Sequence, residues 1–464
     1  MSATPRRFRR REWRRDEIRV NDPTATRRSI AGTAIGNFME WYDFGVYGYI
    51  ATTIAQVFYP GNSVIAVHLI ATFGTLAAAF VVRPLGGLIF GPLGDRIGRK
   101  RVLMTTILLM ALGTTGSGLL PGYSTIGIWA PILLLVARIF QGLSTGGEYV
   151  GAMTYLGEQV PDRKRGMMVG FLPMGNLSGF VLAGLLVTGL QTWLPSHDML
   201  TWGWRIPLLL SAPFGVVALV LRMRLEESAA YQNASADSNA DEHEQLFSTF
   251  LEQWKPMLVC AALVVTSSAA DYMLTGYLPT YLKVVVRVGQ TAGLVMITAT
   301  LTILMAVLVL VAKLSDHIGV KPIMRTGCGL LIAAAVPAFL LIRSGAYPLI
   351  FIGVLLIGLM ELCFDSTSPA ALPALFPTDV RYGALAIAYN VSISTVGGST
   401  PLIAQALVSG TGNVMVPAYM LIVAGLVGAF TLPFMPEVAG RRLPGSAPAV
   451  ESQQEARELA GDVE

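Results

Sequence analysis

Two carboxylates in an apolar, aromatic stretch are the first residues of this sequence that could do chemistry. The stretch from Gly36 to Tyr49 reads GNFMEWYDFGVYGY and holds Glu40 and Asp43. Because these acids are three residues apart, a helix would place both on one face. An ionisable group at the middle of a bilayer costs at least about 2.5 kcal/mol, so each acid is a functional candidate if its segment spans a membrane.

Arg138 is the basic residue best placed to meet these acids. Counted at about 1.5 Å per residue from the ends of their segments, Glu40 and Arg138 reach similar depths, and Gln141 shares a helical face with Arg138. One guanidinium cannot neutralise two carboxylates. We therefore expect one of Glu40 and Asp43 to bind substrate and the other, left without a partner, to carry a coupling proton. A fixed pair that only joins two helices is the alternative.

Three further acids lie deep in later apolar segments. Asp271, Glu361 and Asp365 have no evident basic partner in nearby segments. Because an unpaired acid facing lipid would be costly, at least one of them should face a cavity. We assign Asp271 to proton coupling and Glu361 and Asp365 to substrate binding.

Aromatic residues cluster beside these acids. Trp41, Tyr47 and Tyr272 are candidate substrate contacts, because ring faces attract quaternary ammonium ions. Packing between helices is their alternative role. Arg138 could bind the carboxylate of a substrate, and the acids and aromatic rings could bind its cationic group. This set of residues therefore suits a zwitterion better than a di- or tricarboxylate, because a di- or tricarboxylate should demand several basic groups.

Membrane-spanning helices are needed to position these side chains. Hydrophobic residues make up 53% of the 464 and charged residues 13%, against about 25% charged in soluble domains. Apolar stretches long enough to cross a hydrocarbon core of about 30 Å recur along the chain. We predict an all-α membrane protein with twelve transmembrane helices. The predicted spans are 29–58, 64–93, 101–121, 125–157, 166–191, 204–222, 256–286, 290–314, 322–343, 347–375, 383–409 and 414–435.

The distribution of charge predicts the orientation of these spans. Most of the 33 Lys and Arg residues fall in the tails and in the loops on the N-terminal side, whereas loops 59–63, 121–124, 192–203 and 410–413 contain none. The positive-inside rule then places both termini in the cytoplasm, in a cell (inner) membrane. The Arg-rich start, RRFRRREWRR, should set topology and attract anionic lipid, and we expect no nucleic-acid partner. No cleaved signal peptide is expected.

Two loops of the first part of the sequence each resemble a loop of the second part, and both matches have nearly the same separation along the chain. GPLGDRIGRKR at 91–101 resembles AKLSDHIGVKP at 312–322, and PDRKRG at 161–166 resembles PTDVRYG at 377–383. The repeat predicts two six-helix halves in parallel orientation. The expected organisation is a cytoplasmic tail at 1–28, an N-terminal bundle at 29–222, a cytoplasmic linker at 223–255, a C-terminal bundle at 256–437 and a cytoplasmic tail at 438–464.

The repeated loops supply the expected gating residues. Asp95 aligns with Asp316, and Arg165 aligns with Arg381. Val320 stands where the first half has Arg99, so the two halves cannot contribute equally. The full set of expected gating residues is Arg83, Asp95, Arg96, Gly98, Arg99, Arg165, Asp316 and Arg381. Arg83 is expected to brace the loop near Asp95 or, equally, to contact substrate.

No group of residues in the sequence suggests catalysis. Cys260, Cys328 and Cys363 fall inside predicted spans, and no nucleophile has an activating base nearby. We therefore expect no enzymatic activity, no cofactor and no metal site.

Several motifs together carry a resemblance to a known family. GPLGDRIGRK resembles the signature loop of the major facilitator superfamily, and GNFMEWYDFGVYGY, ARIFQGLSTGGEYVGA, PDRKRG and WGWRIP resemble its metabolite:proton symporter branch. IGIWAPILLL and LPALFPTDVRYGALA resemble the proline/glycine-betaine transporters of that branch. The resemblance, over about residues 28–437, implies a cavity lined by helices one, four, seven and ten, and adds Glu148 to the proton-coupling candidates.

The expected function is proton-coupled symport of a small zwitterionic osmolyte, such as proline, glycine betaine or ectoine, by alternating access. Proton symport of an organic acid, such as citrate, 2-oxoglutarate or shikimate, is the nearest alternative. A non-transporting membrane sensor is a third, although neither the linker nor the C-terminal tail is long enough for an added signalling domain.

Overall fold

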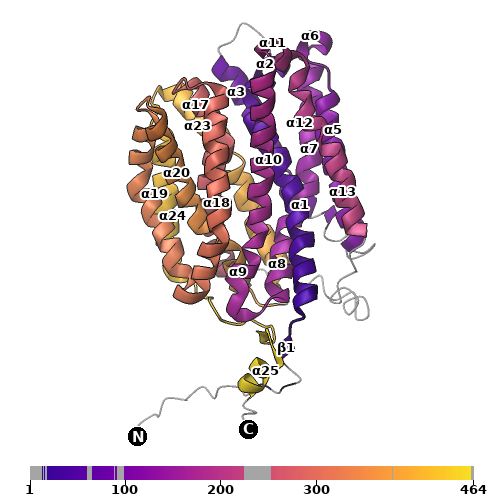
Figure 1. Ribbon diagram of the computed structural model, residues 1–464, viewed down its shortest axis with the longest axis vertical. Helices are drawn as coiled ribbons and strands as arrows, with labels where there is room; N and C mark the ends of the chain where they lie inside the picture. Colours follow the sequence, from indigo (N-terminus) through magenta and orange to yellow (C-terminus); the bar gives the residue numbers. More distant parts are fainter. Residues whose placement is uncertain are drawn as a thin grey trace.

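Two helical bundles lie side by side in the computed structural model (Figure 1). Early helices form one bundle and late helices the other, and both chain ends lie at the same end of the molecule. The structure describes residues 13, 15, 18–59, 65–87, 89, 90, 99–223, 252–378 and 380–460. The predicted gating residues Asp95, Arg96 and Gly98, the first twelve residues of the Arg-rich tail and residues 224–251 of the linker lie outside the described residues. Arg99 begins a described helix, but its side chain also lies outside the described part.

The predicted set of twelve spans is confirmed. Ten described helical stretches are long and apolar enough to cross a membrane. The other two are the first span, which carries Arg27, Arg28, Glu40 and Asp43, and the third, whose apolar part runs only from Met104 to Leu119.

The described residues of the first half form fourteen elements, several of which join end to end into one span. They are α1 (Pro23–Tyr49), α2 (Ala51–Phe58), α3 (Ile65–Val81), α5 (Arg99–Leu119), α6 (Tyr123–Ile126), α7 (Trp129–Thr145), α8 (Glu148–Gln159), η2 (Asp162–Lys164), α9 (Arg165–Val169), α10 (Phe171–Trp193), α11 (Ser196–Asp198), η3 (Met199–Gly203), α12 (Arg205–Leu209) and α13 (Ser211–Met223).

The second half follows the same plan. Its elements are α16 (Trp254–Tyr272), η4 (Met273–Tyr277), α17 (Leu278–Val284), α18 (Gln290–Ile318), α19 (Val320–Ile342), α20 (Tyr347–Asp365), α21 (Ser368–Ala371), η5 (Pro373–Leu375), α22 (Arg381–Ser392), η6 (Ile393–Gly397), α23 (Thr400–Thr411), α24 (Val416–Thr431) and η7 (Leu432–Phe434). The turns η4 and η6 are π-helical, a local widening that is frequent at functional sites.

The start of α1 is fixed by local sequence. The Asp22 carboxylate accepts hydrogen bonds from the backbone N–H groups of Thr24 (2.9 Å) and Ala25 (3.4 Å), and Pro23 occupies the first helical position. An N-cap acid and a proline at this position both favour a helix start. The first helix therefore begins six residues before the predicted span at Ser29.

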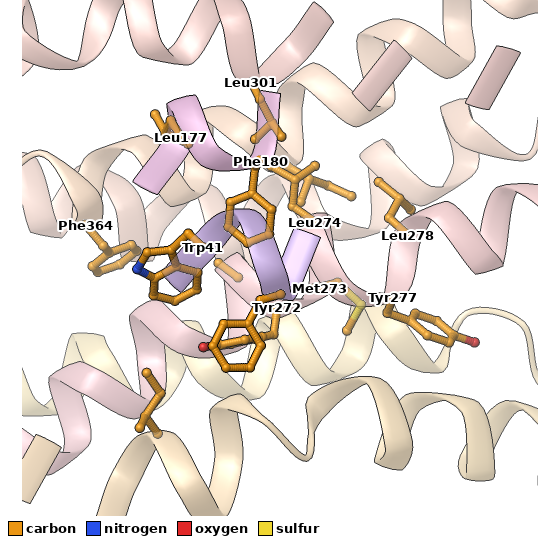
Figure 2. Packing of buried hydrophobic residues seen from close by; sticks show 14 of the residues in the cluster. Trp41, Leu177, Phe180, Tyr272, Met273, Leu274, Tyr277, Leu278, Leu301 and Phe364 are labelled. Atoms are coloured by element: carbon orange, nitrogen blue, oxygen red, sulfur yellow. The ribbon is translucent and has the colours of Figure 1, made fainter. Parts of the chain in front are cut away.

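The two halves pack against each other through α10 with α18 and through α1 with η4. Aromatic rings fill the middle of this contact, as Figure 2 shows. The Trp41 ring lies 5.5 Å from that of Phe180 and 6.0 Å from that of Tyr272, which belongs to the second half. The core is therefore continuous across the interface between the halves.

A small strand pair is an exception to the all-α prediction. β1 (Arg19–Val20) pairs in parallel with β2 (Ala449–Val450), and α25 (Gln453–Ala460) packs beside them. The pair lies at the end of the molecule that holds both termini (Figure 1).

Candidate functional site

Asp43 on α1 forms a buried ion pair with Arg138 on α7. Arg138 Nη1 donates to Asp43 Oδ2 at 3.1 Å, and the two residues are 1% and 2% exposed. The guanidinium also lies 4.1 Å from the centre of the Tyr47 ring, which adds a cation–π contact. The sequence left Glu40 and Asp43 open as partners of Arg138, and the structure shows that the partner is Asp43.

Glu40 has a guanidinium partner of its own. Arg83 Nη2 donates to Glu40 Oε1, and both side chains are buried. The Arg83 guanidinium lies 4.5 Å from the centre of the Phe80 ring and 5.0 Å from that of Phe44. The prediction that one acid of the first span lacks a basic partner is therefore wrong. Whether Arg83 also braces the loop near Asp95 stays a prediction, because that loop lies outside the described residues.

Close packing of the second span against α7 brings Arg83 to this position. A Cβ atom added to Gly142 would lie 1.9 Å from the backbone oxygen of Ala79, and one added to Gly146 would lie 2.1 Å from that of Arg83. Only glycine permits helices to approach so closely. The glycines of both segments were the available signal for this contact, and depth estimates along single helices could not reveal it.

The three acids of the second half line one cavity at the interface between the halves. Asp271 from α16 and Glu361 and Asp365 from α20 face it, and no Lys, Arg or His of the described residues contributes to its wall. Asp271 lies near the middle of the span Trp254–Val284. The prediction that at least one of these acids faces a cavity is confirmed for all three.

Asp271 and Glu361 line the same cavity, where no described basic residue is present to offset their charges. Two carboxylates that share a site without a cation favour binding one proton, because like charges repel. Thr275 Oγ1 donates to Asp271 Oδ1 at 3.2 Å, whereas Glu361 Oε2 is buried with no hydrogen-bond partner among the described residues. These two acids are therefore the candidate site for an exchangeable proton.

The opposite wall of the cavity is aromatic and comes largely from the first half. Trp41, Tyr149 and Phe180 line it, together with Tyr389 of the second half. The Tyr149 and Tyr389 rings lie 5.4 Å apart. The Trp41 indole nitrogen is a buried donor without a partner among the described residues, and Asn176 also lines the wall. Sequence reasoning missed Tyr149, Asn176 and Tyr389, because nothing in their local sequence distinguishes them from packing residues.

Several predicted substrate contacts point elsewhere. The Gln141 amide donates to Thr114 Oγ1, the Tyr47 hydroxyl donates to the Thr72 carbonyl at 3.1 Å, and Tyr272 stacks in the aromatic core. These three, together with Glu40, Asp43, Arg138 and Glu148, do not line the cavity. Of the predicted binding and coupling residues, the cavity gathers Trp41, Asp271, Glu361 and Asp365.

The cavity is small, and the two halves contact each other at both ends of the molecule. It leaves about 30 Å³ for the centres of water-sized molecules, room for about two of them. At the end with the chain termini, Arg381 Nη1 donates to Glu158 Oε1. At the opposite end, Lys283 Nζ donates to Thr52 Oγ1 at 2.8 Å. Both contacts join the two halves, so the halves touch at both ends of the molecule in this conformation.

Predicted gating residues gather at the end with the termini. The Asp316 carboxylate accepts hydrogen bonds from the backbone N–H groups of Gly166 (2.7 Å) and Met167 (2.9 Å), at the start of α9 in the other half. Arg165 and Arg381 are both buried there. These contacts place Asp316, Arg165 and Arg381 where the halves must separate if this end opens.

The fold and the site define a class, a multi-pass membrane transporter of two helical bundles around a central polar cavity. The family model described as Major Facilitator Superfamily matches residues 33–401, and the chain belongs to this superfamily. It is 40% identical over 451 residues to the "Proline/betaine transporter" of Escherichia coli (strain K12), with 96% of this chain and 90% of that protein covered. The "Glycine betaine/proline/ectoine/pipecolic acid transporter OusA" of Dickeya dadantii (strain 3937) is also 40% identical, over 452 residues and with the same coverage.

Solved structures share the fold. The structure of the "proton:xylose symporter XylE bound to 6-bromo-6-deoxy-D-glucose" gives a TM-score of 0.73 at 18% identity, over 90% of this chain and 98% of that chain. The "partially occluded inward open conformation of the xylose transporter XylE from E. coli" gives 0.70 at 18% identity, over 90% and 100%.

Proposed function

We propose that this protein is a proton-coupled symporter that imports a small zwitterionic osmolyte, such as proline, glycine betaine or ectoine, across the cell (inner) membrane. The names of its 40% identical relatives support the substrate class. The orientation, with both termini in the cytoplasm, rests on the positive-inside distribution of Lys and Arg. Attraction of the Arg-rich tail to anionic lipid belongs to the same proposal.

The observation that carries the proposal is that Asp271 and Glu361 line one cavity between the halves. Like charges so placed favour one bound proton, and the cavity wall of the described residues offers no fixed cation to replace it. We therefore assign the coupling proton to this pair, and not to Glu40 or Asp43, whose charges are already balanced by Arg83 and Arg138.

The same cavity suits a zwitterion. Asp365 and the ring faces of Tyr149 and Tyr389 can receive an ammonium group. The unpartnered Trp41 indole N–H can donate to the substrate carboxylate. A di- or tricarboxylate would face three acids without a basic group to offset them, so this cavity disfavours the organic-acid alternative.

The balance of charge in the cavity then explains how substrate and proton transport are coupled. Closing the halves around the cavity removes its carboxylates from water, and each uncompensated charge makes that closure costly. A proton on the Asp271–Glu361 pair removes one charge, and the ammonium group of the substrate offsets another. Closure around substrate is therefore favoured when the proton is also bound.

Uptake into membrane vesicles tests this function. Labelled proline and glycine betaine should accumulate when an inward proton gradient is imposed, and a protonophore should abolish the accumulation. A panel of citrate, 2-oxoglutarate and shikimate should compete poorly. Absence of gradient-driven accumulation of any zwitterion, with efficient uptake of one of these acids, would favour the alternative.

A further inference from the structure

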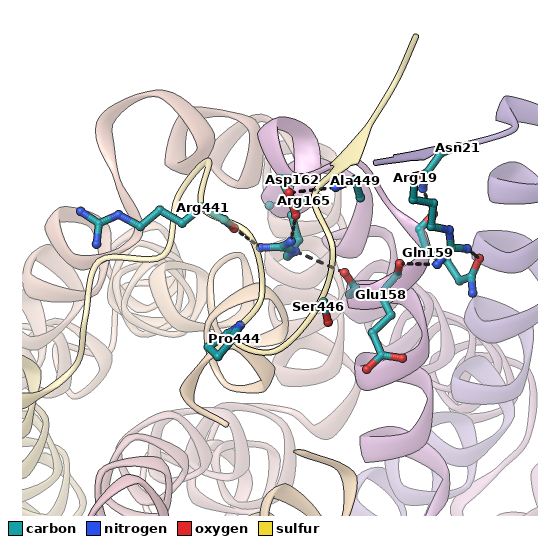
Figure 3. Close-up of polar contacts among 12 residues, drawn as sticks. Arg19, Asn21, Glu158, Gln159, Asp162, Arg165, Arg441, Pro444, Ser446 and Ala449 are labelled. Atoms are coloured by element: carbon teal, nitrogen blue, oxygen red, sulfur yellow. Dashed lines mark hydrogen bonds and ion pairs between the residues drawn. The ribbon is translucent and has the colours of Figure 1, made fainter. Parts of the chain in front are cut away.

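The segment that follows the last span crosses the end of the molecule where both termini lie. Residues 438–450, here called the C-terminal strap, continue from α24 of the second half and end at β2, beside η2 of the first half (Figure 3). The strap makes contacts on both halves, and each set can be followed residue by residue.

Two arginines at matching positions of the sequence repeat both hold the strap. Arg165 Nη1 of the first half donates to the Arg441 carbonyl at 2.7 Å, and Arg381 Nη2 of the second half donates to the Pro444 carbonyl at 2.6 Å. Arg165 and Arg381 are 4% and 0% exposed. If the strap left, each buried guanidinium would lose a charge-assisted hydrogen bond.

The second half adds further contacts to the middle of the strap. The Thr378 backbone N–H donates to the Pro444 carbonyl at 3.1 Å, and the hydroxyl groups of Thr378 and Ser446 lie 3.0 Å apart. This part of the strap is thus fixed to the segment that begins α22.

The first half holds the end of the strap. The Ala449 backbone N–H donates to Asp162 Oδ2 at 3.0 Å. The strand pair adds hydrogen bonds from the N–H of Arg19 to the Pro448 carbonyl (2.9 Å) and from that of Asn21 to the Val450 carbonyl (3.0 Å). Figure 3 shows the contact between Asp162 and Ala449, with Glu158 and Gln159 of α8 nearby.

A small apolar cluster completes the attachment. Ile18, Val450 and Ala456 are buried together under α25. Lys164 and Arg163 form ion pairs with Glu451 and Glu455 of the segment that follows the strap. These pairs are partly exposed and contribute little by themselves, so the backbone contacts and the cluster dominate.

Opening this end of the transporter requires the halves to move apart, because Arg381 of the second half contacts Glu158 of the first. The strap binds both halves within residues 441–450, so one set of its contacts must break as well. We propose that the C-terminal strap is a clasp that stabilises the conformation closed at the terminal end and must leave one half before that end opens. This role goes beyond the transport function and depends only on separation of the halves.

Release of the clasp can be tested with one substitution in the apolar cluster. Val450, 2% exposed, is changed to aspartate in the full-length protein. The matched control is Leu459→Asp, the same kind of change at a residue of the same tail that is 45% exposed. Hydrogen–deuterium exchange followed by mass spectrometry then reports on segments 158–170 and 378–390 at the terminal end, and on 48–58 and 276–290 at the opposite end.

With the clasp released, exchange at the terminal end should become about tenfold faster, and exchange at the opposite end should become slower, because the two ends open alternately. Leu459→Asp should change neither. Faster exchange confined to residues 441–460, with both ends of the bundles unchanged, would overturn the proposal. This readout needs no substrate, so it stands apart from the outcome of the uptake experiment.

Covalent closure of the clasp gives the opposite test. Thr378→Cys with Ser446→Cys ties the strap to the second half, and Val20→Cys with Val450→Cys ties it to the first. Ser446 and Val450 are separated by at most about 14 Å of chain, so both disulfides together hold the halves at a short distance.

Each disulfide alone leaves one set of contacts free to break, so uptake of labelled proline should continue. Both together should lower uptake at least about tenfold, and a reducing agent should restore it. Full uptake with both disulfides formed would refute the clasp. Failure of the unmodified protein to take up any zwitterion would refute the proposed function and leave the exchange measurement to decide the clasp.

Discussion

The two halves handle their buried charges in opposite ways. In the first half, two buried acids of α1 each have an arginine partner, Asp43 with Arg138 and Glu40 with Arg83. The second half gathers Asp271 and the two acids of α20 at one cavity, where no described basic residue lines the wall. Two halves built on one repeated plan therefore differ in net charge at the very depth where substrate should bind.

This difference separates charges that only hold helices together from charges that can be neutralised and released during transport. A buried pair that already satisfies both partners has little reason to take up a proton, because doing so would leave an unpaired cation. A group of acids without a fixed cation must instead be neutralised by something mobile, such as a proton or the cationic end of a substrate. The first half thus supplies a rigid charged frame and the aromatic wall, and the second half supplies the variable charge.

The largest expected effect comes from breaking a pair in the first half. Arg138→Met would leave the Asp43 carboxylate buried without its partner, at a cost of about 3–5 kcal/mol. We expect a large loss of thermal stability in detergent and no measurable uptake. The double variant Asp43→Leu/Arg138→Met should recover most of the stability without recovering transport. Arg343→Met, at an exposed helix end, is the control and should melt like the parent.

Glu361→Gln tests whether the acids of the second half carry the coupling proton. It removes the exchangeable proton while keeping the side-chain shape, so proton-driven accumulation should be lost and exchange of internal for external substrate should persist. Asp271→Asn should behave in the same way, and the double variant should lose no more than either single one, because under the proposed function the two residues share one proton. Glu252→Gln, on an exposed helix end, should leave accumulation intact. Normal accumulation by Glu361→Gln would move the coupling site elsewhere.

A moderate effect is expected at the aromatic wall. Trp41→Phe keeps a ring but removes the unpartnered indole N–H, so the substrate carboxylate would lose one hydrogen bond. The KM for uptake should rise about tenfold with little change in kcat. Trp254→Phe, at a residue 54% exposed, should leave KM unchanged. An unchanged KM in Trp41→Phe would mean that the carboxylate binds other donors.

The smallest effect concerns Glu437, between the last span and the C-terminal strap. Burial tends to raise the pKa of Glu437, but hydrogen bonds from the backbone N–H groups of Val320, Ala439, Lys321 and Val438 lower it below its ordinary value. The charged form is therefore favoured in the folded state. This contribution is present above the ordinary pKa of about 4.3 and is lost as the pH falls through the lower folded value.

Glu437→Gln should lower stability at pH 7 by at most about 1 kcal/mol, because the side chain is partly exposed and acts as a helix cap. The deficit should disappear in acid, where the parent loses its own charge. Thermal melts between pH 3 and pH 7 would measure this, with Glu252→Gln as the reference. A deficit that grows on acidification would have the wrong sign for a lowered pKa.

Much of the fold could be predicted from the sequence. Long apolar stretches, the charge distribution and the matching loops around Arg165 and Arg381 predicted twelve spans in two parallel halves, because bilayer thickness and repeat spacing act locally along the chain. The sequence also limited the chemistry to a few buried acids and arginines, and it singled out Asp271, Glu361 and Asp365 as acids without an evident partner.

Only the tertiary structure decided which charges meet. The pairing of Glu40 with Arg83 depends on how closely the second span approaches α7, and the cavity depends on which faces of α8, α16 and α22 turn toward the interface. The C-terminal strap contacts residues almost three hundred positions earlier in the chain. Such contacts follow from the packing of helices that are distant in the sequence. The periodicity of a single helix does not encode this packing, so no local sequence pattern could predict these contacts.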